Sequence, residues 1–141
     1  MKAISLYEPW ATLIALGKKR YETRSWSTTY RGPLLICASI KRPPLHETIG
    51  VLYRAGINSD ELKPGRAVAI VELIGVHPTK ALVYAELGED EQYFGDFSSG
   101  RFAWQLKNIR RILKPPPIKG RQGLFDIPDD LIKNLDTYDP I

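Results

Sequence analysis

Short segments of β-forming residues, separated by turns rich in proline and glycine, constrain the fold of this chain more than any other feature. Residues 67–76 are rich in Val and Ile and are predicted to form a long central strand, and residues 33–40 are almost entirely apolar. Further strands are expected at residues 2–6, 20–24, 101–113 and 123–127. Five or six strands in a chain of 141 residues favour an α+β fold, a small mixed β-barrel with short flanking helices.

Helices are predicted between the strands. Apolar residues recur at helical spacing within residues 8–16, and Gly17 fits the left-handed position that ends a helix. Residues 45–55 also repeat apolar side chains at helical spacing. Two shorter helices are expected at residues 80–86 and 128–135. Residues 88–100 are polar, acidic and glycine-containing, which indicates a long loop.

One stretch has the character of a site rather than of a scaffold. The pattern G-x-K-x-x-E-x-R directly follows the first predicted helix and consists of Gly17, Lys19, Glu22 and Arg24. Strand alternation places Glu22 and Arg24 on one face, and the flexible side chain of Lys19 can fold back toward that face. The pattern therefore predicts a carboxylate held between two cations. The alternative is a solvated, charged edge strand beside a helix C-terminus.

Size and composition predict a single domain over residues 1–141. Hydrophobic residues make up 43% of the chain, which is enough for one core. No apolar run approaches the roughly 20 residues that a membrane helix needs, and the N-terminus lacks the apolar stretch of a secretory signal. A cytoplasmic protein that does not bind membranes is therefore expected.

The sequence predicts no cofactor and no metal site. Its single cysteine, Cys37, lies in the apolar segment 34–38, which predicts a buried and inert thiol. The two histidines, His46 and His77, are far apart in the sequence and have no Cys or His at ligand spacing.

Charge is distributed unevenly along the chain, whose net charge is +4. Residues 1–42 hold eight Lys or Arg against two acids, and residues 100–125 hold seven against none. Residues 86–99 hold five acids and no base. If the two basic blocks meet in the fold, they form a positive surface that attracts polyanions. A mixed, solvated surface is the alternative.

The motif and several other segments resemble the ASCH domain, a small relative of the PUA-type RNA-binding barrels. Similarity to bacterial and phage members of that family extends over residues 3–6 with 9–11, residues 24–28 with 30–33, and residues 95–97 with 100–104. The resemblance covers most of the chain. It implies a PUA-like barrel with helices beside its mouth, where the G-x-K-x-x-E-x-R segment lines a cleft.

The residues around the motif suit the binding of single-stranded RNA, a nucleoside or a nucleotide, which is the leading hypothesis. Such a site needs cations for phosphate, a planar stacking surface and a few fixed polar groups. Trp26 has polar neighbours, which leaves a cleft position and a core position open, whereas Trp10 and Trp104 are expected in the core. The predicted ligand-binding residues are Lys18, Lys19, Arg24, Ser25, Trp26, Tyr30 and Arg31.

A metal-independent hydrolase is the alternative, with Lys19, Glu22 and Arg24 as its catalytic residues. The resemblance implies either an amidohydrolase of acetylated cytosine nucleosides, in which a threonine occupies the position of Glu22, or a ribonuclease. A neighbouring cation favours loss of a proton from Lys19, whereas Glu22 favours the ammonium form. A charged Lys19 would polarise a carbonyl group or hold a phosphate. A third hypothesis is an interaction module whose charged motif only keeps an edge strand soluble.

Overall fold

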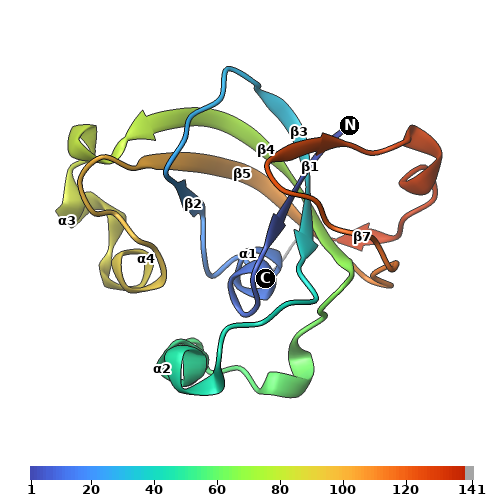
Figure 1. Ribbon diagram of the computed structural model, residues 1–141, viewed down its shortest axis with the longest axis horizontal. Helices are drawn as coiled ribbons and strands as arrows, with labels where there is room; N and C mark the ends of the chain where they lie inside the picture. Colours follow the sequence, from blue (N-terminus) through green and yellow to red (C-terminus); the bar gives the residue numbers. More distant parts are fainter. Residues whose placement is uncertain (139–141) are drawn as a thin grey trace.

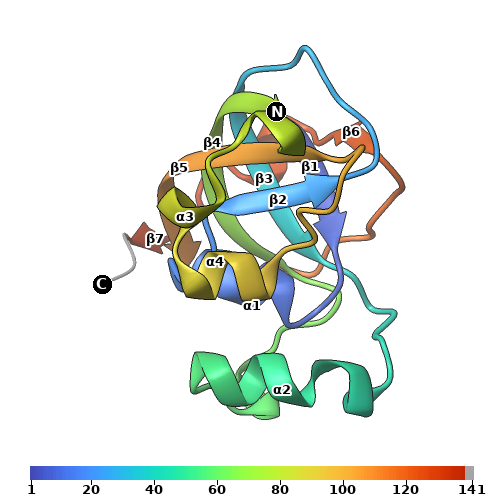
Figure 2. The same ribbon diagram turned by 90° about the vertical axis from the view of Figure 1, so that its left-hand side faces the viewer.

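The computed structural model describes residues 1–138 as a strongly curled sheet with short helices around it (Figures 1 and 2). Its strands are β1 (Lys2–Leu6), β2 (Tyr21–Arg24), β3 (Gly32–Ala38), β4 (Ala67–Pro78), β5 (Phe102–Ile112), β6 (Leu124–Asp126) and β7 (Thr137–Tyr138). Its helices are α1 (Trp10–Ala15), α2 (Leu45–Ala55), α3 (Tyr84–Leu87) and α4 (Glu89–Phe94). Short 3₁₀ turns lie at Ser59–Glu61, Thr79–Ala81 and Asp129–Leu131.

The strands are arranged in the order β2-β5-β4-β3-β1-β6, and β7 pairs with β5. β1 and β3 are parallel, whereas the other neighbouring strands are antiparallel. Within the described residues, the two terminal strands of this order, β2 and β6, do not pair with each other. The curled sheet is therefore a half-barrel with an open seam, and the predicted α+β fold with a small mixed barrel and short flanking helices is confirmed.

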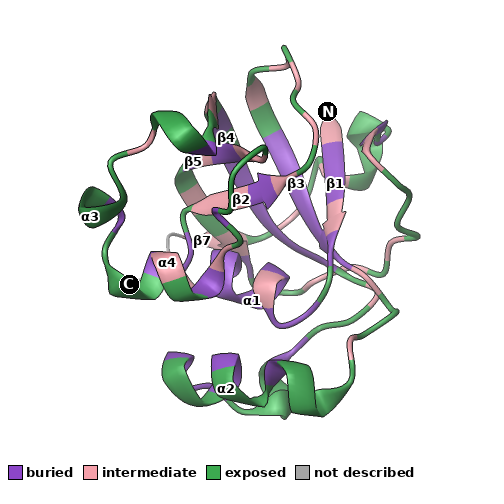
Figure 3. Cartoon of the chain, turned by 60° about the vertical axis from the view of Figure 1, so that its left-hand side comes forward, coloured by how far each residue is buried: buried purple, intermediate pink, exposed green. Residues whose placement is uncertain are grey.

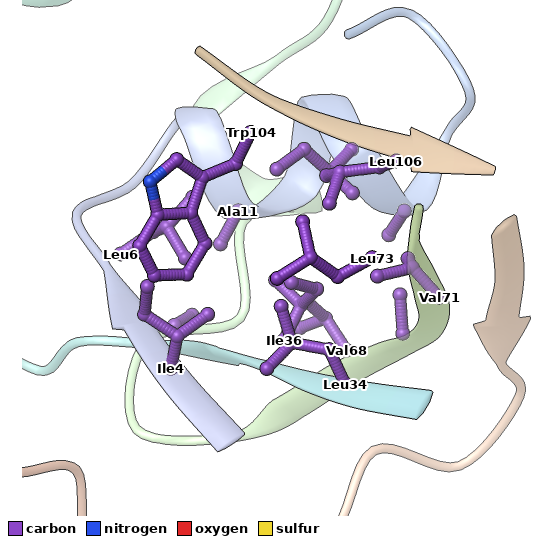
Figure 4. Packing of buried hydrophobic residues seen from close by; sticks show 14 residues of the cluster. Ile4, Leu6, Ala11, Leu34, Ile36, Val68, Val71, Leu73, Trp104 and Leu106 are labelled. Carbon is purple, nitrogen blue, oxygen red and sulfur yellow. The ribbon is translucent and has the colours of Figure 1, made fainter. Parts of the chain in front are cut away.

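The concave side of the half-barrel contains the main core (Figure 4). Trp104 of β5 is 0% exposed and packs with aliphatic side chains of β1, β3 and β4, while Ala11 and Ile14 of α1 fill one end. Alternation along each strand explains this arrangement, because every second residue points to the same side. Complete burial of one such large side chain contributes about 1.5–3 kcal/mol, so these layers hold the curvature on which the site depends.

Helix α2 lies at one end of the molecule, beyond α1 and α4 (Figure 2). Its buried side packs Val51 and Leu52 against Leu13 of α1 and Phe94 of α4, while the side turned away from the sheet is exposed (Figure 3). Gly56 ends the helix in the left-handed conformation, with φ of 70°, which glycine adopts without steric cost. No helix within residues 1–138 has the length and apolar character needed to cross a membrane.

Two predicted elements in the middle of the chain differ from the structure. The expected helix 80–86 is divided, because Leu82 and Val83 are extended between the 3₁₀ turn and α3, and Leu82 packs on a small apolar cluster with Leu87. The expected loop 88–100 contains α4. Acidic residues fill the first turn of α4, where the helix dipole stabilises negative charge.

The predicted C-terminal helix 128–135 is also wrong, since only the 3₁₀ turn Asp129–Leu131 forms there. The chain instead turns back toward β5. Leu113 N donates to Asp136 O at 2.8 Å, and Thr137 then pairs with Ile112. These strand contacts require an extended backbone where the local sequence pattern favours a helix.

Candidate functional site

The open seam of the half-barrel places the charged motif at the edge of the concave side. In the described part of the chain, strand β2 pairs with β5 alone, and its register sets Glu22 opposite Trp104 and Arg24 opposite Phe102. Residues directly opposite each other in a sheet share a face. Because Trp104 belongs to the main core, Glu22 and Arg24 point toward the concave side rather than toward the outer surface.

Arg24 connects the two sides of the seam. Its Nη2 lies 3.0 Å from Glu22 Oε2 on the same strand and donates to the carbonyl oxygen of Ser5, at the end of β1, at 2.8 Å. The side chains of Arg24 and Glu22 are only 23% and 13% exposed. A pair that is mostly shielded from water is held more firmly than an ordinary surface ion pair, so the motif has a fixed geometry.

Lys19 is buried beneath this pair. Gly17, with φ of 74°, ends α1 and turns the chain so that Lys19 precedes β2. Its side chain is 1% exposed, its Nζ donates to Tyr21 O, and that nitrogen lies 3.9 Å from Glu91 Oε2. Burial lowers the pKa of Lys19 from its ordinary value of 10.5, and the carboxylates of Glu22 and Glu91 oppose this shift. Desolvation therefore has the larger effect on this lysine.

Glu91 is the member of the site that sequence reasoning did not find. It comes from α4, is 3% exposed, and accepts hydrogen bonds from the backbone nitrogens of Arg20 at 2.8 Å and Tyr21 at 3.3 Å. It thus holds both the turn before β2 and the ammonium group of Lys19. The acidic segment around Glu91 was predicted to be a loop, and nothing in its spacing indicates that one carboxylate points inward.

These residues line a cleft of about 1260 Å³ that contains Lys19, Glu22 and Arg24 in its lining. Its walls come from the end of β1, from residues 39–41, from residues 93–96 and from residues 118–123. The two basic blocks, residues 1–42 and residues 100–125, therefore meet here: Lys41 belongs to the first, and Arg101, Lys119 and Arg121 belong to the second. The three residues of the predicted arrangement share this lining, but within residues 1–138 Glu22 pairs with Arg24, whereas Lys19 pairs with Glu91.

Aromatic side chains form part of the same walls. Trp26 is half-buried, lines the cleft and packs edge-to-face on Trp104, with 4.9 Å between ring centroids and an interplanar angle of 88°. Trp10, expected only in the core, packs against two core clusters and also lines the cleft. Tyr7 and Tyr93, each 48% exposed, and the buried Phe94 complete a set of five aromatic residues in the lining.

Four predicted ligand-binding residues lie outside the lining of the cleft: Lys18, Ser25, Tyr30 and Arg31. The Tyr30 hydroxyl donates to Pro33 O, and the Arg31 guanidinium donates to Thr28 O and Tyr30 O at 2.9 and 2.8 Å. These two side chains therefore shape the loop between β2 and β3. Ser25 and Lys18 are exposed.

Two buried polar atoms at the cleft have no hydrogen-bond partner within the described part of the chain, Ser5 Oγ and Arg24 Nε. Buried polar groups in proteins nearly always have a partner, so these atoms are available for a ligand. No group of three or more His, Cys, Asp or Glu side chains within residues 1–138 is arranged to hold a metal ion. Cys37 is buried, and burial raises the pKa of its thiol to about 12.

The half-barrel with a charged motif on its edge strand defines the class of protein, a PUA-like fold. The model of the ASCH domain matches residues 4–116, and the chain belongs to the ASCH domain family. Solved structures agree on the fold. The ASCH protein of Zymomonas mobilis superposes with a TM-score of 0.62 at 18% sequence identity, over 96% of this chain and 95% of that chain. A mutant of the same protein gives 0.61 at 18% identity, over 96% of each chain.

Curated relatives are found in animals. Activating signal cointegrator 1 of Mus musculus and that of Homo sapiens are each 30% identical to this chain over 131 residues. The matched region is 88% of this chain but only 22% of each relative. The chain thus spans less than a quarter of the length of the curated relatives that it matches.

Proposed function

We propose that this protein binds single-stranded RNA, or a nucleotide that can carry a modified base, in the cleft at the open seam of the half-barrel. The observation that carries the proposal is that Lys19, Glu22 and Arg24 line one cavity with aromatic walls. The proposal treats residues 1–141 as one domain, because β1 and β6 from opposite ends of the chain pair in the same sheet. A cytoplasmic location of the protein is part of the proposal and is based on the sequence.

Each part of the cleft suits one part of such a ligand. Stacking a base on an aromatic side chain contributes about 1–3 kcal/mol, and five aromatic residues line the walls, four of them at least partly exposed. The Glu22 carboxylate can accept hydrogen bonds from base amino groups, and Arg24 Nε is a free buried donor for a base acceptor. The volume of about 1260 Å³ exceeds the roughly 300–1,000 Å³ of ordinary small-molecule pockets, which favours more than one nucleotide unit.

Binding of a fluorescein-labelled single-stranded RNA, followed by anisotropy, tests the proposal. Arg24→Gln should weaken binding by about tenfold, since a good edge contact contributes about 1–3 kcal/mol. Arg110→Gln is the matched control, because Arg110 of β5 is exposed and lies outside the cleft lining. The same strand as DNA measures the contribution of the 2′-hydroxyl groups. Negligible, salt-insensitive binding by wild type and Arg24→Gln alike would reject the proposal.

A second function, metal-independent hydrolysis of a modified nucleoside or of RNA, is favoured by one observation. Burial lowers the pKa of Lys19, and an amine that loses its proton more readily can act as a base or a nucleophile. Thr23, the residue after Glu22, has a hydroxyl group that is buried and accepts a hydrogen bond from Asp96 N at 3.2 Å. Lys19 is therefore the residue on which turnover would depend.

Chromatography of N-acylated nucleosides and of RNA, incubated without added metal, tests this second function. Products should form with the wild type and be lost with Lys19→Met and Glu22→Gln. Arg110→Gln should retain the wild-type rate. Intact substrates after prolonged incubation across the panel would rule out this function while leaving the binding proposal in place.

A further inference from the structure

One wall of the cleft carries cations that are not part of the charged motif. Residues 118–123, between β5 and β6, cross the end of β1 and carry Lys119 and Arg121. Lys41 stands on another wall. These three residues, here called the basic rim, are exposed, and within residues 1–138 their side chains form neither an ion pair nor a hydrogen bond with the protein.

The segment that carries two of these cations is held at a defined position. On its N-terminal side, Ala67 N donates to Pro116 O at 3.0 Å and Ile118 N donates to Gly65 O at 2.9 Å. On its C-terminal side, the chain continues into β6, which sets Leu124 opposite Ile4 of β1. Lys119 and Arg121 are therefore presented from a short segment that is fixed at both ends.

Gly120, between the two cations, brings this segment directly against the motif. A Cβ atom at Gly120 would lie 2.4 Å from Ser5 Oγ and 3.2 Å from Ser5 Cβ, so a larger residue there requires either the Ser5 hydroxyl or the segment to move. Ser5 is also the residue whose carbonyl oxygen accepts a hydrogen bond from Arg24 at 2.8 Å. Lys119 and Arg121, on either side of Gly120, are therefore held close to Ser5 and to Arg24 of the motif.

The cations of the basic rim give the cleft its net positive charge. The lining contains two acids, Glu22 and Asp96, and each already has an arginine partner, at 3.0 Å from Arg24 and 3.4 Å from Arg101. Lys19 is buried beside Glu91. Among the cations of the cleft lining, those of the basic rim are the ones without an ion-pair partner in residues 1–138, so the anionic part of a ligand is attracted to the rim rather than to the motif.

We infer that the cleft recognises a phosphorylated nucleotide unit, with the base over Glu22 and Arg24 and the phosphate at Lys119 and Arg121. This inference rests on the proposed function and adds the chemical class of the ligand: phosphate is required, and a free nucleoside binds poorly. It also assigns the phosphate contacts to residues 118–123 instead of to the β2–β3 loop.

The test compares three proteins in titrations of a labelled single-stranded RNA at several salt concentrations. Lys119→Gln with Arg121→Gln removes two rim cations. Lys107→Gln with Arg110→Gln is the matched control, because these exposed residues of β5 belong to the same basic block but lie outside the cleft lining. The rim variant should bind about tenfold more weakly at low salt, and its log–log salt slope should be smaller by about 1.4, since each lost phosphate contact on a single strand removes about 0.7. The control should change the slope by less than half of that amount.

Competition with unlabelled nucleosides and their 5′-monophosphates identifies the source of the phosphate. Monophosphates should displace the RNA better than the nucleosides do, and the rim variant should lose this preference. Displacement of the RNA by monophosphates indicates recognition of single nucleotides. Displacement by oligonucleotides alone indicates recognition of a nucleic-acid strand. Both outcomes support the inference. If the wild type binds RNA but the rim and control variants behave alike, the inference is overturned while the proposed function stands. If the wild type binds neither RNA nor nucleotides, both fail.

Discussion

Replacement of Glu91 by Gln tests the buried charge arrangement on which the site depends. The carboxylate accepts backbone hydrogen bonds from Arg20 and Tyr21 and lies 3.9 Å from Lys19 Nζ. An amide keeps one acceptor oxygen but turns an NH₂ group toward the other backbone N–H, and it removes the charge opposite Lys19. Loss of one partner of a buried pair costs about 3–5 kcal/mol, and an unpaired buried donor costs about 1–3 kcal/mol.

The expected loss of unfolding free energy for Glu91→Gln is about 3 kcal/mol, at the lower end of that range because one backbone hydrogen bond survives. For a domain of this size the melting temperature should fall by about 10 °C. Glu89→Gln, on the same helix, is the control: its side chain is 94% exposed, and surface substitutions change stability by about 0.5 kcal/mol or less. Urea unfolding followed by circular dichroism measures both variants.

Lys19→Met combined with Glu91→Gln tests whether the pair itself is responsible. Replacing both charges should restore about 1–2 kcal/mol relative to the sum of the single losses, since the uncompensated buried charge disappears. If Glu91→Gln is as stable as Glu89→Gln, the carboxylate does not hold the β2 turn and the reasoning is refuted. If the two single losses simply add, Glu91 acts only through the backbone and not through Lys19.

Three further outcomes are expected. Gly120→Ala should weaken RNA binding, and Ser5→Ala combined with Gly120→Ala should recover part of the lost affinity, because removal of the Ser5 hydroxyl relieves the 2.4 Å contact. Anisotropy measurements that show no recovery contradict the close packing of Gly120 against Ser5. The pKa of Lys19 in the folded protein is lowered from 10.5, so between these two pKa values the unfolded chain binds more protons than the folded one. The unfolding free energy of the wild type, relative to that of Lys19→Met, should therefore rise with pH in that window. Urea titrations from about pH 7 to about pH 10 measure this difference, and a constant difference contradicts the prediction. Arg24→Gln should cost more than 1 kcal/mol of unfolding free energy, because it leaves a mostly buried carboxylate unpaired, whereas Arg31→Gln should cost about 0.5 kcal/mol or less; equal melting curves would favour a purely solubilising motif.

The strands of this fold were predictable because their signal is local. Alternation and β-branched residues locate β4 and β3 within a few residues of their observed bounds, Ala67–Pro78 and Gly32–Ala38. The shared face of Glu22 and Arg24 follows from the same two-residue period and holds in the structure. Local rules failed at residues 128–135, where pairing of Thr137 with β5 outweighs a helix-compatible pattern.

The partners of the motif were not predictable, because they come from distant parts of the chain. Glu91 is 71 residues away from Arg20 in sequence, and Gly120 is 115 positions beyond Ser5. In sequence, a buried carboxylate in an acidic run has the same appearance as its exposed neighbours. Asp90, next to Glu91, is 70% exposed and pairs with Arg54, so only the rotation of a six-residue helix separates the two roles.

The charged motif was open to two interpretations, a soluble edge strand or a site, and the open seam explains why both describe the same residues. An edge strand exposes unpaired backbone groups, and charged side chains protect such an edge from association. Here β2 is such an edge strand, but the sheet curls so that its free side faces β1 across the seam, and Arg24 donates to the Ser5 carbonyl there. On a flat sheet the Arg24 guanidinium would only increase solubility, whereas in this curled sheet it is a fixed hydrogen-bond donor at the floor of a cleft. Sequence period determines which side chains share a face, whereas curvature determines whether that face meets water or a cavity, and curvature arises from the packing of the whole core.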